Sequence, residues 1–222
     1  RWNVILISMN KNLYIFGNGD MAEVVHYYFN NHSDFKIEAF VVDDEYFKDK
    51  FFCEKKVLTT SDFLKLNKDN IFIFVALGYR ELNKVREKKY QFFKEKGYKF
   101  ASYISNKATV LNNENIGENC LVLENNVIQP FVTIGHNVII WSGNHIGHHS
   151  IIEDNVYISS QVVISGRVKV CKNSFIGVNS TFRDNIKVGS FSIFGAGSLI
   201  SKDTDDFSIY KSDSSIKSKI PS

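Results

Sequence analysis

The sequence predicts an α/β domain followed by a parallel β-helix. In the first hundred residues a strand, a glycine turn and a helix follow one another, and two more apolar strands come after them. The β-helix is predicted by an apolar residue at every sixth position from Ile104 to Ile200. We therefore expect the α/β domain over residues 9–100, the β-helix over residues 101–205 and a tail over residues 206–222.

The α/β domain opens with the stretch "NLYIFGNGDMAEVVHYYF" at residues 12–29. Its apolar run "LYIF" is typical of a buried strand, and the two glycines after it permit a sharp turn. Ala22, Val25 and Phe29 then recur at helical spacing. This order of elements predicts the first half of a βαβ unit.

Two more strands and a helix complete the expected domain. The strands are "IEAFVVDD" (37–44) and "NIFIFVALGY" (70–79). The stretch "RELNKVREKKYQFFKEKGY" (80–98) reads as an amphipathic helix that Gly97 closes. Because helices separate the strands, a small parallel, Rossmann-like βαβ domain is expected.

The glycine turn is similar to a nucleotide-binding fingerprint. Gly17, Gly19 and Ala22 fit Gly-x-Gly-x-x-Ala, in which a helix N-terminus faces phosphate. Asp43 and Asp44 end the second strand, and Asp43 lies 24 residues beyond Gly19, about where a ribose-binding acid would fall. The alternative is a tight turn that binds nothing. The domain is short for a dinucleotide site, so a nucleotide ligand smaller than NAD fits it better.

The second half of the chain has an unbroken six-residue period. Seventeen successive positions are apolar: Ile104, Val110, Ile116, Val122, Ile128, Ile134, Ile140, Ile146, Ile152, Ile158, Ile164, Val170, Ile176, Phe182, Val188, Phe194 and Ile200. The residue two places earlier is mostly small or valine, and the residue after is often glycine. This is the hexapeptide pattern of a parallel β-helix, in which three hexads close one triangular coil and residues 18 apart stack.

Composition excludes several other classes of protein. The net charge of +3 is mild and evenly spread, so nucleic acid is not expected as a partner. No apolar run approaches the roughly 20 residues that span a bilayer, and no membrane insertion is expected. Three widely spaced cysteines fit free thiols in a reducing cytoplasm better than a metal or redox motif. We expect Met9 to be the natural start and residues 1–8 to be a non-native leader.

A small α/β domain followed by such repeats resembles the hexapeptide-repeat sugar acetyltransferases. This family includes bacterial sialic acid O-acetyltransferases and N-acetyltransferases of nucleotide-linked 4-amino-4,6-dideoxy sugars. The resemblance covers Lys11 to about Tyr210. It implies a left-handed β-helix, a homotrimer, acetyl-CoA as co-substrate in the groove between adjacent prisms, and a nucleotide-linked amino sugar on the N-terminal domain.

The resemblance also implies roles for particular residues. Those implied to border the nucleotide sugar are Gly17, Gly19, Asp20, Met21, Asp43, Asp44, Ala76, Leu77 and Gly78. Those implied to meet CoA are Gly166, Val178, Gly195, Ala196 and Gly197. The catalytic motif falls on "HHSII", with His148 as the base and His149 where the family usually has an acid. The stretch "YKSDSSIKSKIPS" replaces the Gly-x-Pro-Ala-Lys tail of many members.

Four histidines lie in or near "WSGNHIGHHS", and the six-residue register separates them. His148 and His149 fall at a corner, His145 falls on the outer side of a strand, and His136 falls at a different corner above which Asp154 stacks. Gly166 stacks on His148 and is expected to leave open space beside the imidazole for a thioester. Neutral histidine suits proton removal from an attacking amine or hydroxyl near physiological pH.

These features predict an acetyl-CoA-dependent N-acetyltransferase of a nucleotide-linked amino-deoxy sugar, acting in the cytoplasm in surface glycan biosynthesis and without a metal. O-acetylation is the alternative, because both acceptors need the same base and groove. Two further alternatives are a zinc enzyme of the γ-carbonic anhydrase type, whose prisms bind zinc through histidines, and a non-catalytic assembly protein.

Overall fold

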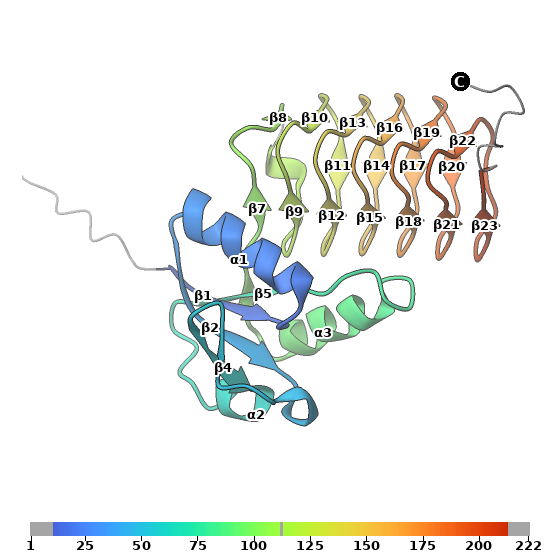
Figure 1. Ribbon diagram of the computed structural model, residues 1–222. Coiled ribbons are helices and arrows are strands. Elements are labelled where there is room, and N and C mark those ends of the chain that lie inside the picture. The colour runs from blue at the N-terminus through green and yellow to red at the C-terminus, as the bar shows by residue number, and fades with distance from the viewer. Residues whose placement is uncertain (1–10, 112, 213–222) are drawn as a thin grey trace, which may run out of the picture.

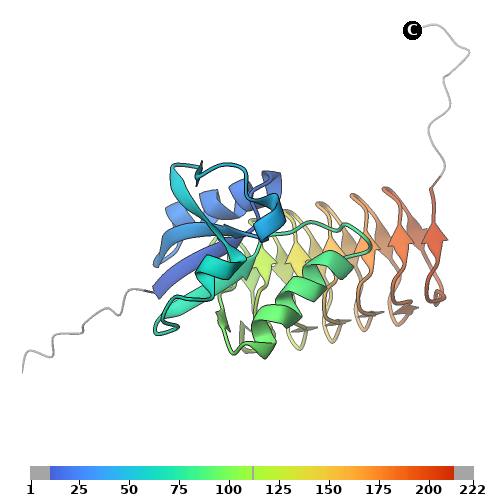
Figure 2. The same ribbon diagram turned by 90° about the horizontal axis from the view of Figure 1, so that it is seen from below.

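The computed structural model describes residues 11–111 and 113–212, and the leader expected over residues 1–8 lies outside them. An α/β domain lies beside a long prism, against the first half of its length (Figure 1). Seen from below, α3 runs along the same face of the prism that the rest of the domain covers (Figure 2). The predicted fold class, an α/β domain followed by a hexapeptide-repeat β-helix, is confirmed.

The α/β domain is built on a sheet with the strand order β3-β4-β2-β1-β5-β6. Its strands are β1 (Lys11–Phe16), β2 (Phe35–Val42), β3 (Phe51–Phe52), β4 (Lys55–Thr59), β5 (Ile71–Val75) and β6 (Lys99–Phe100). Its helices are α1 (Asp20–His32), α2 (Thr60–Phe63) and α3 (Lys84–Glu95), with a 3-10 turn at Asp44–Tyr46. The pairs are parallel except for β3 with β4.

Helices α1 and α3 cover opposite faces of this sheet. Val25 and Phe29 of α1 pack with Leu13 in one apolar cluster, and Phe93 of α3 packs with Phe16 in another. Alternate residues of a strand point to opposite faces, so β1 contributes to both clusters. The strand order reverses between β1 and β5, which places a ligand crevice at the carboxyl ends of these strands.

The helix expected from Arg80 begins instead at Lys84. Glu81, Leu82 and Asn83 have φ angles of +52°, +52° and +65°, which no right-handed helix can contain. The sequence-based expectation was therefore wrong over the first turn, where helix-favouring side chains conceal a left-handed loop.

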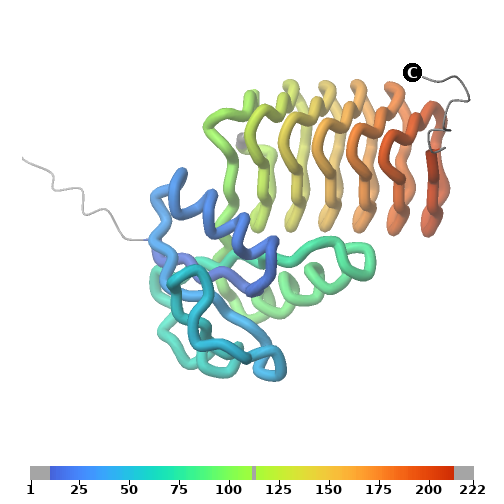
Figure 3. Tube along the Cα trace, in the orientation of Figure 1, coloured from blue at the N-terminus to red at the C-terminus, as the bar shows by residue number. Residues whose placement is uncertain are grey.

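The prism has three faces, each a stack of two-residue parallel strands. The coils that carry these strands follow one another along the prism (Figure 3). Face 1 contains β7 (Tyr103–Ile104), β9 (Leu121–Val122), β12 (Ile139–Ile140), β15 (Tyr157–Ile158), β18 (Phe175–Ile176), β21 (Ile193–Phe194) and β23 (Ile209–Tyr210). Face 2 contains β8 (Thr109–Val110), β10 (Val127–Ile128), β13 (His145–Ile146), β16 (Val163–Ile164), β19 (Thr181–Phe182) and β22 (Leu199–Ile200). Face 3 contains β11 (Thr133–Ile134), β14 (Ile151–Ile152), β17 (Lys169–Val170) and β20 (Lys187–Val188).

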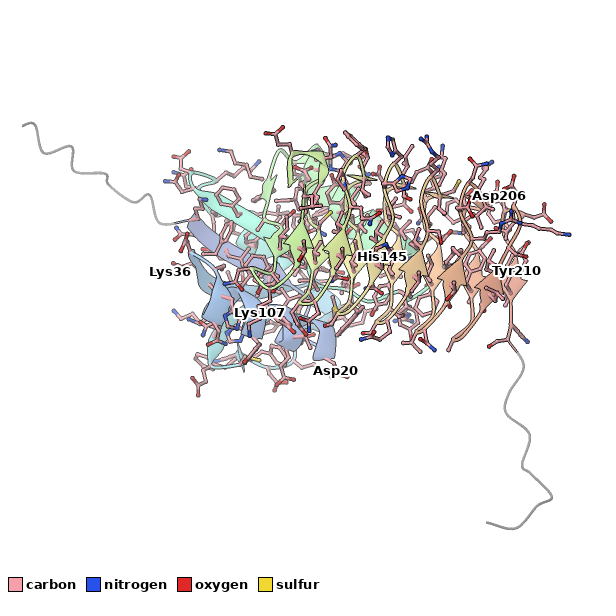
Figure 4. All side chains as sticks on the ribbon, turned by 90° about the horizontal axis from the view of Figure 1, so that it is seen from above. Asp20, Lys36, Lys107, His145, Asp206 and Tyr210 are labelled. Atoms are coloured by element: carbon pink, nitrogen blue, oxygen red, sulfur yellow. The ribbon has the colours of Figure 1, made fainter. Side chains whose placement is uncertain are left out.

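The apolar residue of each hexad points into the prism, as the period predicts. From Val122 to Ile200 every such residue is buried. Ile104, Val110 and Ile116 are only partly buried, because the first coil has a neighbour on one side only. β23 pairs with β21, so the strand stack continues past residue 205 to Tyr210, which lies at the far end of the prism (Figure 4).

Three edges join the faces, and each is named here by one residue. The Val178 edge joins faces 1 and 2 through residues 123–126, 141–144, 159–162, 177–180 and 195–198. The His148 edge joins faces 2 and 3 through residues 129–132, 147–150, 165–168 and 183–186. The Asn155 edge joins faces 3 and 1 through residues 117–120, 135–138, 153–156, 171–174 and 189–192.

A buried arginine joins the α/β domain to the Asn155 edge. The guanidinium of Arg86 donates to the backbone oxygens of Gly78, Asn137 and Asn155 at 3.0, 3.2 and 3.0 Å, and to Asn83 Oδ1 at 2.8 Å. Burial lowers the pKa of Arg86 to about 10. These contacts hold α3 against the prism.

A ladder of asparagine side chains runs along the same edge. Asn119, Asn137, Asn155 and Asn173 are stacked 18 residues apart and joined side chain to side chain. The amide of Val75, at the end of β5, donates to Asn119 Oδ1 at 2.8 Å. The ladder therefore fixes the ligand-binding end of the sheet relative to the prism.

Candidate active site

A cavity of about 270 Å³ lies at the carboxyl ends of β1, β2 and β5, where the strand order predicts a ligand crevice. Its lining residues are Phe16, Gly17, Asn18, Gly19, Val42, Asp43, Tyr46, Leu77, Gly78, Arg80, Val85 and Lys89. The first turn of α1 begins at its rim, so unpaired backbone N–H groups and the positive end of the helix dipole face it. We call this cavity the domain pocket.

Only glycine fits at position 17. Its φ is +118°, and a Cβ there would lie 2.9 Å from the backbone oxygen of Ala76. A Cβ on Gly19, in contrast, would meet nothing within 4 Å, so Gly19 leaves open space at the start of α1. The turn thus brings the backbone close to β5 and keeps the rim of the pocket clear.

Asp43 is held in the domain pocket by an ion pair. Its Oδ1 accepts from Lys89 Nζ at 2.6 Å and from the Thr60 hydroxyl at 3.3 Å. Sequence reasoning missed Lys89. The available signal was the spacing of Val85 and Lys89, four residues apart on α3, which puts both on one side of the helix.

The other acid expected here, Asp44, is bound to Ser61 and is not part of the pocket lining. Asp44 accepts from the backbone N–H of Ser61 at 3.1 Å and from its hydroxyl, and these hydrogen bonds lower the pKa of Asp44. Among the residues expected to border a nucleotide sugar, Gly17, Gly19, Asp43, Leu77 and Gly78 line the pocket. Asp20, Met21, Asp44 and Ala76 do not belong to its lining.

The histidine pair lies on the His148 edge. The Nδ1 atoms of His148 and His149 are 3.0 Å apart, within hydrogen-bond distance. The backbone N–H of His148 donates to Gln129 Oε1 at 2.9 Å. With Nδ1 engaged by its neighbour, the Nε2 atom of His148 remains for a reacting group.

Gly166 stacks on His148 as the register predicts, but the space is not open. A Cβ on Gly166 would lie 2.7 Å from both Cε1 and Nε2 of His148, so the imidazole itself fills that space. The expectation of an empty volume for a thioester was therefore wrong. The six-residue period predicted that Gly166 stacks on His148, but it could not predict the direction in which the His148 ring points.

His149 adopts a left-handed backbone conformation with φ of +61°. Its ring lies 4.6 Å from the Phe131 ring, one coil earlier on the same edge. Desolvation lowers the pKa of His149, and the charges of Arg167 and His148 lower it further. A neutral imidazole beside His148 can accept a hydrogen bond, as the carboxylate of an acid would.

The remaining residues expected to meet CoA lie on a different edge. Val178, Gly195, Ala196 and Gly197 all belong to the Val178 edge, whereas Gly166 belongs to the His148 edge. Val178 is 48% exposed, and a Cβ on Gly197 would meet only the Ser212 hydroxyl, at 3.8 Å. These residues are therefore not part of the surface that carries His148.

His145 and His136 do not converge on the histidine pair. His145 is on β13 of face 2, seen from the side opposite to the α/β domain (Figure 4). His136 is on the Asn155 edge, where its backbone N–H donates to Asp154 Oδ1 at 2.7 Å and its Nδ1 accepts from the Glu118 amide. Over residues 11–111 and 113–212 no three His, Cys, Asp or Glu residues are grouped to hold a metal.

The α/β domain and the His148 edge lie on opposite sides of the prism. Tyr28 of α1 donates to Glu124 of the Val178 edge at 2.8 Å, and Arg86 of α3 contacts the Asn155 edge. The domain thus spans face 1 from edge to edge. The His148 edge joins the other two faces. Within one chain, the domain pocket and His148 therefore lie on different sides of the prism.

Comparison with known proteins identifies both parts of the chain. Residues 12–93 match the family described as PglD N-terminal domain. Residues 115–146 and 132–166 match the bacterial transferase hexapeptide family of six repeats. No curated protein sequence is significantly similar to the chain.

Solved structures share the whole architecture. The acetyltransferase domain of PglB from Neisseria gonorrhoeae, in complex with acetyl coenzyme A, is 24% identical, with 90% of this chain and 95% of that chain covered and a TM-score of 0.79. A variant of perosamine N-acetyltransferase from Caulobacter crescentus, in complex with CoA and GDP-perosamine, is 21% identical, with 89% and 92% covered and a TM-score of 0.79. WeeI from Acinetobacter baumannii is 19% identical, with 89% and 94% covered and a TM-score of 0.75.

The fold and the two matched segments define a hexapeptide-repeat transferase. The chain thus joins a segment that matches the PglD N-terminal domain family to a segment that matches the bacterial transferase hexapeptide family, the combination expected of a hexapeptide-repeat sugar acetyltransferase. Within the part of the chain that the structure describes, no helix is long and apolar enough to cross a membrane.

Proposed function

We propose that the chain is an acetyl-CoA-dependent N-acetyltransferase that acts on the amino group of a nucleotide-linked 4-amino-4,6-dideoxy sugar. The observation that carries this proposal is the pairing of a nucleotide-sized pocket at the switch point of the sheet with a histidine pair on the prism. Among proteins of the same fold, PglB was solved with acetyl coenzyme A and perosamine N-acetyltransferase with CoA and GDP-perosamine.

His148 would act as the general base. The sugar nitrogen bonds to the acetyl carbonyl carbon and gives its proton to His148 Nε2. The carbon–sulfur bond then breaks, and the proton passes from His148 to the leaving thiolate. Direct transfer of this kind forms no acetylated protein.

His149 would set the tautomer of His148. For Nε2 to accept a proton, the hydrogen of neutral His148 must be on Nδ1, and that N–H needs an acceptor. His149 Nδ1, 3.0 Å away, is that acceptor as long as His149 is neutral. The lowered pKa of His149 keeps it neutral at physiological pH.

The corner at Gly195, Ala196 and Gly197 suits part of acetyl-CoA. A Cβ on Gly195 would lie 3.3 Å from the backbone oxygen of Tyr210, and φ of Gly197 is +70°. Both positions favour glycine, which lets an extended ligand approach the backbone closely.

A homotrimer would complete the site. Since one chain holds His148 apart from its own domain pocket, a closed ring of copies is needed to bring the His148 edge of one chain to its neighbour's pocket. We infer that the reaction takes place in the cytoplasm, where acetyl-CoA and nucleotide sugars are made, and that its product enters surface glycan synthesis.

Thiol release tests the activity. The full chain is mixed with acetyl-CoA and, separately, with UDP-, dTDP- and GDP-linked 4-amino-4,6-dideoxy sugars and their 4-hydroxy counterparts. We expect thiol release with one or more amino sugars, and a product heavier by one acetyl group. Release with the hydroxyl sugars alone would assign O-acetylation instead, and no release with any acceptor would refute the proposal.

A further inference from the structure

A second cavity, of about 650 Å³, lies between the loop after β5 and face 1 of the prism. Tyr79, Arg80 and Lys84 line it from the loop and the start of α3, and Phe175 and Ile193 line it from β18 and β21. Arg80 also lines the domain pocket, so it stands at the boundary between the two cavities. We call the second cavity the loop pocket.

The order of strands in the sheet indicates which part of a linear ligand would lie in each cavity. Strands β2, β1 and β5 are consecutive neighbours in the sheet. Asp43 follows β2, the glycine turn follows β1, and Arg80 follows β5. A nucleotide sugar is linear, with the base at one end, the diphosphate in the middle and the sugar at the other end. With its diphosphate at the α1 N-terminus and its base toward Asp43, its sugar extends past β5 toward Arg80.

Arg80 has the charge and shape to bind the diphosphate. Lys89, the other cation of the domain pocket, is already paired with Asp43 at 2.6 Å. Arg80 takes part in none of the ion pairs or side-chain hydrogen bonds found within residues 11–111 and 113–212. A guanidinium donates through a planar fork, which matches the oxygens of a phosphate.

The loop that carries Arg80 is held in a strained conformation. Three consecutive residues, Glu81 to Asn83, have positive φ, and such backbone persists only where its surroundings hold it. The ring centroids of Tyr79 and Phe175 are 4.5 Å apart. Asn83 Nδ2 donates to the backbone oxygens of Asn173 and Ser174 at 3.2 and 3.3 Å. The prism thus fixes the loop before any ligand binds.

We propose that Arg80 binds the diphosphate of the nucleotide sugar and that the loop pocket receives the glycosyl unit. This inference rests on the proposed function. The aromatic faces of Tyr79 and Phe175 offer an apolar wall for the ring of a deoxy sugar, and Glu81 supplies a carboxylate for its amine. Ile193 is two residues before Gly195, so the glycosyl unit would lie beside the corner assigned to CoA.

Calorimetric titration of the full chain separates the two parts of this proposal. UDP, dTDP and GDP are compared with their monophosphates, and the best nucleotide is then tested as its commercially available sugar conjugate. Arg80→Gln should weaken the binding of the diphosphate about 10- to 100-fold and leave that of the monophosphate nearly unchanged. Ile193→Trp, which fills the loop pocket, should leave the diphosphate unaffected and weaken the sugar conjugate by about 10-fold. Lys36→Gln, at the start of β2, is the control: it also removes one positive charge, and it should change the binding of neither the diphosphate nor the sugar conjugate.

The outcomes distinguish this inference from the proposed function. If Arg80→Gln binds the diphosphate as tightly as the original chain does, Arg80 is not the diphosphate ligand. If Ile193→Trp binds the conjugate equally well, the glycosyl unit lies elsewhere. Either result overturns the inference while a nucleotide-binding domain remains, whereas no binding of any nucleotide by the original chain would remove the proposed function itself.

Discussion

The imidazole of His148 lies against Gly166, one coil further along the same edge. A Cβ on Gly166 would be 2.7 Å from His148 Cε1 and Nε2, closer than side chains approach one another. The glycine therefore gives the imidazole its place on the prism. Its hydrogen-bonding neighbour His149 then fixes the rotation of the ring.

Replacing Gly166 by alanine should displace the His148 ring without unfolding the prism. The φ of Gly166 is not in the left-handed region, so alanine is tolerated by the backbone. We expect thiol release to fall about 10- to 100-fold, because a misplaced base loses much of its effect. Ser165→Ala, one residue earlier, is the control, and equal rates for the two variants would show that the contact has no catalytic role.

Removing the base has a larger expected effect. His148→Asn should lower kcat by roughly 10²–10⁴-fold, the usual contribution of a general base. His32→Asn, at the end of α1, removes a histidine from a different surface and should keep full activity. Sedimentation should give the same oligomer for both variants. An unchanged rate for His148→Asn would exclude His148 from the reaction.

The pH dependence of the rate tests the role of His149. Because the pKa of His149 is lowered, we expect activity to hold at pH 7 and to fall in acid, where His149 takes up a proton and can no longer accept from His148. His149→Asp places a carboxylate beside His148 and stabilises its imidazolium, so the acid limb of kcat/KM should move to higher pH. His149→Ala removes the acceptor and should cost about 10-fold in rate. An acid limb that stays in place in His149→Asp would refute the proposed contact.

The junction between the domains should depend on Arg86. Arg86→Met leaves the backbone oxygens of Gly78, Asn137 and Asn155 without their buried donor. The free energy of unfolding in urea should fall by about 2–4 kcal/mol. Arg183→Met, an exposed arginine on the His148 edge, should change it by less than about 0.5 kcal/mol. Equal midpoints for the two variants would contradict the assignment of Arg86 as the joint.

The prism could be predicted from the sequence because its structure repeats every six residues. Ile146 is inward since every sixth residue is inward, and no tertiary information is needed to place it. The same register put His148 at a corner and Gly166 beside it. Ring direction was not readable, because it depends on the contact between the two Nδ1 atoms.

The α/β domain was readable in outline but not at its contacts. The glycine turn predicted the pocket, whereas the pairing of Lys89 with Asp43 joins residues 46 apart in the chain. In the sequence, Arg86 is one of several charged residues on an amphipathic helix. The neighbouring residues do not indicate that its guanidinium binds backbone oxygens of the prism. The asparagines at 119, 137, 155 and 173 were a visible signal, because their spacing of 18 marks one edge.

The central claim is that the domain pocket of one chain works with His148 of another, and subunit mixing tests it most directly. Gly19→Trp fills the pocket from a position where a Cβ meets nothing, and His148→Asn removes the base. Each variant alone should be nearly inactive in thiol release. Coexpressed in equal amounts, they should recover about one quarter of the original activity, because about one site in four of a random closed ring combines an intact pocket with an intact base. A mixture no more active than its components would contradict the account and would place the whole site within a single chain.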